Sequence, residues 1–184
     1  LIIKSKKFFK KIDGAIHAAY PRSPQWGHSI EDLKLNYINQ DLSNQLGSAI
    51  YFSKEIMQHF KEHKKGDLIH ISSIYGVRAP KFDLYQGTDM TTPIEYAAIK
   101  SGIISMCKWL AKYYSGNNIR VNCISPGGIL DNQPKSFLKK YNEQCTNIGM
   151  LSAAQVSETI VYLLSEKSKP INGQNIIIDD GWSL

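Results

Sequence analysis

Short strand-like segments alternate with helical segments along this chain, and that order limits the possible folds more than any other feature of the sequence. The strand-like segments are rich in apolar residues and cover 13–19, 67–73, 119–124 and 175–178. The first of them has the composition of a short buried strand. Strands separated by helices form βαβ units, whose strands pair in parallel. We therefore expect an α/β fold built on one parallel sheet.

Helical periodicity fills the intervals between these strands. A first helix is expected from near Ser29, where Ser29 and Asp32 form a variant of the capping box, with interruptions to about His63 and an end at Gly66. A second long helix is expected from near Pro93 to about Tyr114. Shorter helices are expected at 136–144 and 153–165, with a long loop at 74–93. No repeat or linker interrupts this pattern, so residues 1–184 are expected to form a single domain.

The composition argues against several classes of protein. The net charge of +6 comes from lysines scattered in short runs, so we expect no nucleic-acid interface. No apolar run approaches the roughly 20 residues of a membrane span, so no membrane partner is expected. The 3 cysteines form no CxxC pair, which favours a reducing cytoplasm over a disulfide framework or a zinc site. His59 and His63 are spaced one helical turn apart without an evident third ligand, so no metal site is expected.

Tyr96 and Lys100 are four residues apart within the second long helix, so their side chains share one face. A cation about 5 Å from a phenol contributes roughly 3 kcal/mol at an effective dielectric constant near 20, or about two pKa units. We therefore expect Lys100 to lower the pKa of Tyr96 toward the range of proton transfer at neutral pH. By itself this spacing is equally typical of an ordinary surface pair.

Three other features give the pair a setting. Ser72 and Ser73 end the preceding strand, at the sheet edge where open α/β sheets bind ligands. Pro126, Gly127 and Gly128 end the next strand at the same edge. Asn44 lies within the first long helix, where a buried amide would need a partner and an exposed one would not.

Taken together, these residues resemble the short-chain dehydrogenase/reductase family over nearly the whole chain. The matching segments occur in the family's order: Asn44 to Gly47, the strand from Asp67 to Ser73, Tyr96 to Lys100, Asn118 to Asn122 with Ser125 to Ile129, and Gly173 to Gly181. The resemblance implies a Rossmann-type doubly wound parallel sheet with helices on both faces and a cofactor that is NAD or NADP.

The resemblance also implies a role for each matching residue. Tyr96 would be the general acid/base, and Lys100 would hold the nicotinamide ribose and lower the Tyr96 pKa. Ser73 would orient the substrate oxygen, and Asn44 would hold a water in a proton relay. Cofactor contacts would come from Tyr96, Lys100, Ala18, Ala19, Pro126, Gly127, Gly128 and the Ile129 backbone. The long helices resemble those that pair subunits in this family, which implies a homodimer or homotetramer.

The chain also departs from the family pattern. The Gly-rich phosphate loop has no counterpart, and the first strands and helices of the Rossmann domain are missing. His17-Ala18-Ala19-Tyr20 stands where the family has Asn-Asn-Ala-Gly, which puts the adenosine-side contact in doubt. Asp131 replaces a Thr that approaches the cofactor phosphates, and Asp180 replaces a Gly near the end of the chain.

Three segments resemble bacterial flagellin-modification oxidoreductases, which belong to nonulosonic-acid sugar pathways: Ala19 to Arg22, the long loop after Ser73, and Gly127 to Pro134. The resemblance implies a small-molecule substrate, an anionic sugar derivative, with Arg22, Arg78 and Tyr85 as candidate contacts. The loop from Arg78 to Met90 is expected either to be a specificity lid or to be a surface excursion without ligand contact.

Two alternatives stay open. A nucleotide-sugar epimerase or dehydratase also uses a Tyr and a Lys at this spacing, but usually carries a larger carboxyl-terminal substrate domain. The missing phosphate loop favours instead a catalytically inactive fragment or pseudoenzyme, because a dinucleotide draws much of its affinity from that loop.

Overall fold

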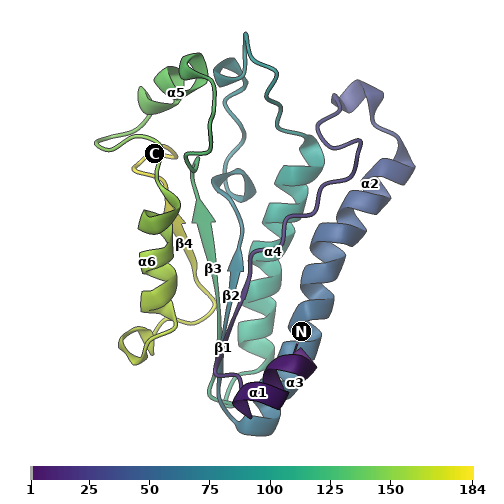
Figure 1. Ribbon diagram of the computed structural model, residues 1–184, viewed down its shortest axis with the longest axis vertical. Helices are drawn as coiled ribbons and strands as arrows, with labels where there is room; N and C mark the ends of the chain where they lie inside the picture. The colour runs from purple at the N-terminus through teal and green to yellow at the C-terminus, as the bar shows by residue number, and fades with distance from the viewer. Residues whose placement is uncertain (1) are drawn as a thin grey trace.

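The structure is a computed structural model that describes residues 2–184. At its centre lies a parallel sheet of four strands in the order β1-β2-β3-β4 (Figure 1). The strands are β1 (Gly14–His17), β2 (Gly66–Ile71), β3 (Ile119–Pro126) and β4 (Asn175–Ile178). All three pairings are parallel, so the expected α/β architecture and its parallel sheet are confirmed.

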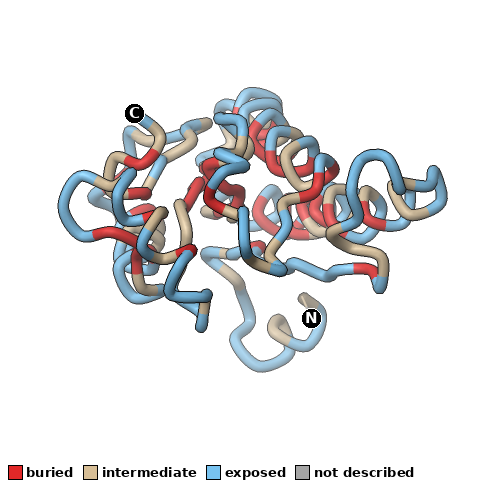
Figure 2. Tube along the Cα trace, turned by 90° about the horizontal axis from the view of Figure 1, so that it is seen from above, coloured by how far each residue is buried: buried red, intermediate tan, exposed pale blue. Residues whose placement is uncertain are grey.

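Helices cover both faces of the sheet, as expected for a Rossmann-type fold. α3 (Ser48–His63) and α4 (Ile94–Tyr113) lie on one face, and α6 (Ala153–Leu163) lies on the other (Figure 1). Alternation along β2 divides its side chains between two cores, because Leu68 packs with α3 and α4 whereas Ile69 packs with the α6 side. Figure 2 shows the buried residues gathered between the sheet and these helices.

β1 is shorter and more exposed than the sequence predicts. It pairs with β2 along one edge, and within residues 2–184 no strand pairs with its other edge. His17 is its one buried residue, and Ile16 is 44% exposed. The prediction of a buried strand over 13–19 is therefore wrong in extent and in burial.

The first long helix begins later than expected. The Ser29 hydroxyl donates to the Asp32 carboxylate at 2.9 Å, but this contact supports only a 3-10 turn at Ile30–Asp32. The continuous helix starts as α2 (Leu35–Leu42), passes through a π-helical turn at Ser43–Gly47 and continues as α3. Its cap is Lys64, in a left-handed conformation with φ of 52°, and not Gly66.

The remaining elements lie close to their predicted places. α4 begins directly after Pro93, α5 spans Lys135–Asn142, and α6 and β4 coincide with the expected segments to within two residues. The helix α1 (Ile2–Phe9) was not predicted, and none of its residues is buried. Among residues 2–184 no helix has the length and apolar character needed to cross a bilayer.

The long loop between β2 and α4 folds against α5 and the end of the chain. Leu84 is 4% exposed, and the Tyr85 ring lies 5.3 Å from the Phe137 ring of α5. The Lys140 ammonium group donates to the carbonyls of Asp83 and Gln86 at 3.1 and 3.2 Å. These contacts pack the loop against α5.

Candidate active site

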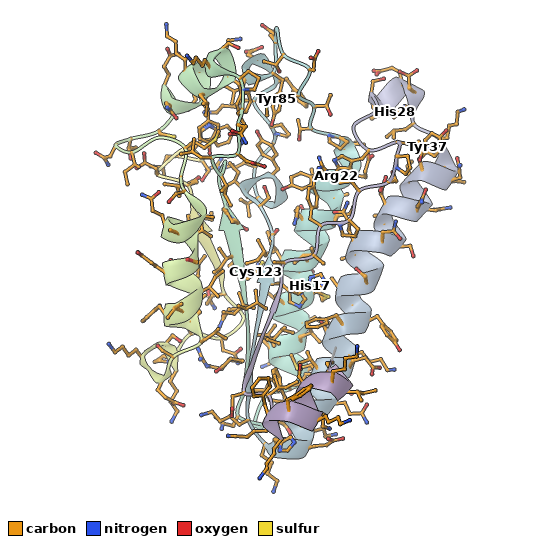
Figure 3. The ribbon with its side chains drawn as sticks, viewed as in Figure 1. His17, Arg22, His28, Tyr37, Tyr85 and Cys123 are labelled. Atoms are coloured by element: carbon orange, nitrogen blue, oxygen red, sulfur yellow. The ribbon has the colours of Figure 1, made fainter. Side chains whose placement is uncertain are left out.

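Three of the four predicted catalytic residues, Ser73, Tyr96 and Lys100, converge above the carboxyl-terminal edge of the sheet. Tyr96 and Lys100 lie in the first two turns of α4, and Ser73 lies two residues after the end of β2. Because β2 and β3 are parallel, Pro126 at the end of β3 reaches the same edge as Ile71 at the end of β2. In Figure 3, Arg22 and Tyr85 lie toward this end of the molecule, with His17 and Cys123 below them.

Lys100 is buried next to Tyr96. Its residue surface is 6% exposed, and its ammonium group donates to the Ile71 carbonyl at 3.1 Å. The same nitrogen lies 5.5 Å from the centre of the Tyr96 ring. Burial lowers the pKa of Lys100 to about 8, because the charged form loses hydration.

The Tyr96 pKa is raised, and this overturns the expectation that Lys100 would lower it. Burial of the phenol is the largest cause, and a hydrogen bond with the Ser73 hydroxyl opposes it. The Lys100 ammonium group donates a hydrogen bond to the Ile71 carbonyl and lies over the Tyr96 ring. The Tyr96 hydroxyl is therefore held in its protonated form, the form that can donate to a substrate oxygen.

The two serines at the end of β2 have different roles. The Ser72 hydroxyl donates to the Lys100 carbonyl at 2.8 Å, which ties the strand to α4. The Ser73 hydroxyl accepts from the Tyr75 amide at 3.2 Å and also lies close enough to Tyr96 to affect its pKa. Ser73 is thus the serine that the fold brings to Tyr96.

The structure does not bring the Asn44 side chain to this cluster. Asn44 is exposed within the π-helical turn, and the next residue, Gln45, is the one that faces the interior. Gln45 is 2% exposed, and its Nε2 atom has no hydrogen-bond partner among the described residues. The sequence alone did not separate the two residues, because the register of a π-turn differs from that of a regular helix.

The glycine turn after β3 is packed by protein on one side. A Cβ atom on Gly127 would lie 2.6 Å from the Tyr141 hydroxyl, and one on Gly128 would lie 2.7 Å from the Met150 methyl group. The Gly128 amide donates to the Tyr141 hydroxyl at 2.6 Å. The absence of side chains here is therefore required by α5 and its neighbours, whatever else the turn contacts. Ile129 bridges to Leu151, and its carbonyl accepts from Gln133.

Three aromatic residues that sequence reasoning missed surround Tyr96. The ring centres of Tyr20, Trp26 and Tyr75 lie 5.6, 6.0 and 6.4 Å from that of Tyr96, all at steep interplanar angles. They come from two loops far apart in the sequence, one after β1 and one after β2. No spacing rule links such positions, so only the tertiary structure reveals them.

The three predicted substrate contacts differ in their placement. The Tyr85 hydroxyl hydrogen-bonds the Tyr75 hydroxyl at 2.7 Å, which brings it beside Tyr96. Arg22 is exposed, and its guanidinium lies 5.8 Å from the centre of the Tyr20 ring. Arg78 is exposed, and among residues 2–184 its side chain makes no described hydrogen bond or ion pair with this cluster.

A histidine pair fills the interior below Lys100. His17 and His70 have ring centres 5.1 Å apart, and His70 hydrogen-bonds the Ser53 hydroxyl at 2.9 Å. Burial lowers the pKa of both imidazoles, that of His70 to about 3, so both stay neutral beside the lysine. The residues that follow, Ala18 and Ala19, are exposed at the open end of β1.

One group of potential metal ligands forms within residues 2–184, at the far end of α3. Atoms of His59, Glu62 and His63 lie within 4.8 Å of one another. However, the Nε2 atom of His59 accepts from the Ile12 amide at 2.9 Å, so the proton of the neutral ring sits on Nδ1. Neither nitrogen is then free to bind a metal.

Two cavities, of about 360 and 380 Å³, lie away from Tyr96. The first lies beside α1, and the second lies at the amino-terminal ends of β2 and β3.

The donor set at the sheet edge fits the nicotinamide half of a dinucleotide. The Lys100 ammonium group makes one described hydrogen bond, to the Ile71 carbonyl. Its remaining N–H groups can donate to a ribose hydroxyl. Tyr96 and Ser73 supply hydroxyl groups beside it.

Asp180 has a structural function. Its carboxylate accepts from the amides of Asn147, Ile148 and Gly149, at 3.0, 2.6 and 2.8 Å. These hydrogen bonds lower its pKa. The residue that departs from the family pattern thus ties the end of the chain to the segment after α5. The amide of Asp131, the other departure, donates to the Gln133 side chain at 2.8 Å.

Comparisons with known proteins agree with this geometry. Residues 1–183 match the family model described as enoyl-(acyl carrier protein) reductase. The chain is 43% identical over 177 residues to the post-translational flagellin modification protein A of Campylobacter coli, covering 96% of this chain and 69% of that protein. It is 27% identical to a 7alpha-hydroxysteroid dehydrogenase of Bacteroides fragilis, covering 100% of this chain and 69% of that protein.

A solved structure gives the same fold. The short chain dehydrogenase of Leptospira borgpetersenii, crystallised with bound NAD+, superposes with a TM-score of 0.89 at 30% identity, covering 100% of this chain and 69% of that one. The chain thus belongs to the short-chain dehydrogenase/reductase family of NAD(P)-dependent oxidoreductases.

Proposed function

We propose that this protein reduces or oxidises a carbonyl or alcohol group of a sugar derivative, with NAD or NADP as the hydride carrier. The observation that carries the proposal is the convergence of Tyr96, Lys100 and Ser73 at one edge of the sheet. When bound, the nicotinamide supplies or accepts the hydride. The protein residues bind, orient and exchange the proton.

The proton is exchanged at the Tyr96 hydroxyl oxygen. In the reducing direction Tyr96 donates its proton to the substrate oxygen, and in the oxidising direction it accepts one. Ser73 lies close enough to hydrogen-bond the same oxygen as charge develops on it. Lys100, with its pKa lowered to about 8, is largely charged at neutral pH and stabilises the phenolate that forms during reduction.

The substrate class is supported by the basic and aromatic groups near Tyr96 and by similarity. Arg22 and the hydrogen-bonded pair of Tyr85 and Tyr75 offer a cation and hydroxyl groups of the kind that bind an anionic sugar. Arg78 stays a candidate contact from the sequence alone. The relative in Campylobacter coli is named a post-translational flagellin modification protein. Because of this similarity, we propose a sugar derivative as the substrate.

The decisive experiment replaces Tyr96 by Phe in the full-length protein. We expect turnover to fall by at least about a hundredfold, because the proton donor is lost while the ring remains. Ser73→Ala should also lower turnover, whereas Tyr37→Phe, on α2, should not. Circular dichroism checks that the fold is intact. Retained turnover in the Tyr96 variant would contradict the proposal.

A second candidate, an inactive fragment or pseudoenzyme, is favoured by the missing Gly-rich loop and by the 69% coverage of the flagellin-modification relative. Fluorescence titration of the 184-residue polypeptide with NADH and NADPH separates the two readings. We expect weak or no binding to this polypeptide and micromolar binding by the full-length protein. Micromolar binding to the polypeptide itself would exclude the fragment reading.

We also propose that the protein acts in the cytoplasm and as a homodimer or homotetramer. The three free cysteines, two of them buried, support a reducing compartment. Exposed aromatic residues on α4, Trp109 and Tyr113, support a subunit interface.

A further inference from the structure

The segment from Tyr20 to Gly27, here called the strap, crosses beside Tyr96 and is held near its middle and at its carboxyl-terminal end. The amide and the hydroxyl of Ser23 both donate to the Asp41 carboxylate of α2, at 3.1 and 2.9 Å. Ser23 is 7% exposed and Asp41 is fully buried. At its far end Gly27, with φ of 97°, approaches Thr91 so closely that a Cβ atom would lie 2.6 Å from the threonine hydroxyl. The strap is therefore held by a buried contact at Ser23 and a close contact at Gly27.

The strap places two aromatic rings against Tyr96. Tyr20 and Trp26 lie 5.6 Å from each other and 5.6 and 6.0 Å from Tyr96. Trp26 also packs against the core of α3 and α4. Tyr20 nevertheless remains 42% exposed. Part of the Tyr20 ring beside Tyr96 is therefore open to a ligand.

The charge around the strap is positive. Arg22 lies 5.8 Å from the Tyr20 ring centre, and Lys100 lies 5.4 Å from it. Within residues 2–184, Asp41 is the only acidic residue described as hydrogen-bonded to the strap, and it is buried and bound to Ser23. An exposed guanidinium beside aromatic rings, with no acidic partner described for it, suits a ligand that has both an apolar face and an anionic group.

We propose that the strap is a substrate subsite for a saturated ring that carries a phosphate or carboxylate group. Tyr20 and Trp26 pack against the C–H face of the ring, and Arg22 binds the anionic substituent. Asp41 is a positioning residue, because it holds Ser23 and thereby the rings on either side of it. The subsite rests on the proposed function, since it orients the substrate carbon toward Tyr96.

Saturation-transfer difference NMR on the full-length protein tests this subsite directly. The aromatic protons are saturated, and transfer is measured to the ring protons of glucose 1-phosphate, glucuronate and glucose, with inorganic phosphate as a competitor. Trp26→Leu should reduce transfer to the charged probes by about fivefold, since one aromatic contact is lost. Phe8→Leu, which changes an exposed aromatic residue of α1, is the control and should leave transfer unchanged.

Arg22→Gln tests the anionic part without endangering the fold, because Arg22 is exposed. It should remove the preference for glucose 1-phosphate or glucuronate over glucose, and the probe that loses more identifies the anionic group. Equal transfer in the Trp26 variant and the unaltered protein, or no preference over glucose before substitution, would overturn the subsite.

The Tyr96→Phe variant keeps the two proposals separate. It should bind the probes normally while losing turnover, so failure of the subsite leaves the oxidoreductase assignment untouched. Conversely, retained turnover in that variant would overturn the oxidoreductase assignment without affecting the measured probe contacts.

Discussion

Burial of Lys100 at the site lowers the free energy of unfolding of the protein. The lysine is 6% exposed, and burial lowers its pKa from 10.5 to about 8. The unfolded chain therefore binds more protons between these values, so stability rises as pH rises from 8 to 10.5. Below pH 8 the buried charge carries its full cost, which we ascribe to the function of the lysine near Tyr96.

Replacing Lys100 by Met should therefore stabilise the protein at pH 7, by at most about 3 kcal/mol, and abolish turnover. The gain should shrink to about 1 kcal/mol or less at pH 10, because the lysine is then neutral in the folded state and most of the interval between its folded pKa of about 8 and its unfolded pKa of 10.5 has been passed. Urea unfolding at the two pH values measures it. Lys112→Met, an exposed lysine on the same helix, serves as the control, and an equal gain at both pH values would contradict the explanation.

Asp180 makes the opposite contribution. Hydrogen bonds from three backbone amides lower its pKa, so its stabilising effect is present at neutral pH and is lost as pH falls through the lowered pKa. We expect Asp180→Ala to lower the melting temperature by a few degrees at pH 7. The difference from the unaltered protein should be smaller at pH 3, which lies below the ordinary aspartate pKa of about 3.9, and should shrink further as the pH falls through the lowered pKa of the folded state. Thermal unfolding monitored by circular dichroism at both pH values would show a constant difference if the charge were irrelevant.

At the scale of elements, the closest packing against a described glycine occurs at Gly66, where β2 begins beside α3. A Cβ atom on Gly66 would lie 2.0 Å from the Phe60 ring, which is fully buried. The start of β2 can therefore approach α3 only because residue 66 has no side chain.

Gly66→Ala should consequently destabilise the protein by about 1–3 kcal/mol through overpacking. Gly47→Ala is the matched control: the nearest atom to its Cβ would be 3.6 Å away, and it lies in a helical turn. That control should be neutral or slightly stabilising. Denaturant midpoints measured for both variants decide the matter, and similar effects of the two substitutions would contradict the packing argument.

At the scale of the whole molecule, the outer faces of α3 and α4 expose large apolar side chains. Trp109 and Tyr113 stack at 4.7 Å between ring centres yet are 60% and 66% exposed, and Tyr51 on α3 is 63% exposed. Such a concentration of aromatic surface is typical of a protein interface.

We therefore expect Trp109→Glu to shift the full-length protein from a dimer or tetramer toward the monomer, because a charge would be buried at the interface. Analytical ultracentrifugation measures the change. Lys112→Glu, on the same helix, distinguishes a specific interface from a general effect of charge. An unaltered oligomer in the Trp109 variant would place the interface elsewhere.

The sequence by itself determined the parallel α/β architecture, because strand and helix periodicities are local and survive in any packing. It also determined the pairing of Tyr96 with Lys100, since four residues along a helix define one face. The boundaries that it missed depend on non-local contacts. β1 is exposed because its outer edge has no described partner, and α2 begins at Leu35 instead of near Ser29.

Only the tertiary structure decided which groups surround the reacting hydroxyl. The choice of Gln45 over Asn44 as the inward residue depends on a π-turn, and the Tyr20 and Trp26 rings reach Tyr96 through the Ser23–Asp41 contact. The direction of the Tyr96 pKa shift likewise depends on burial of the phenol outweighing its hydrogen bond with Ser73. Burial and loop packing are properties of the assembled core, so no local pattern in the sequence could have fixed them.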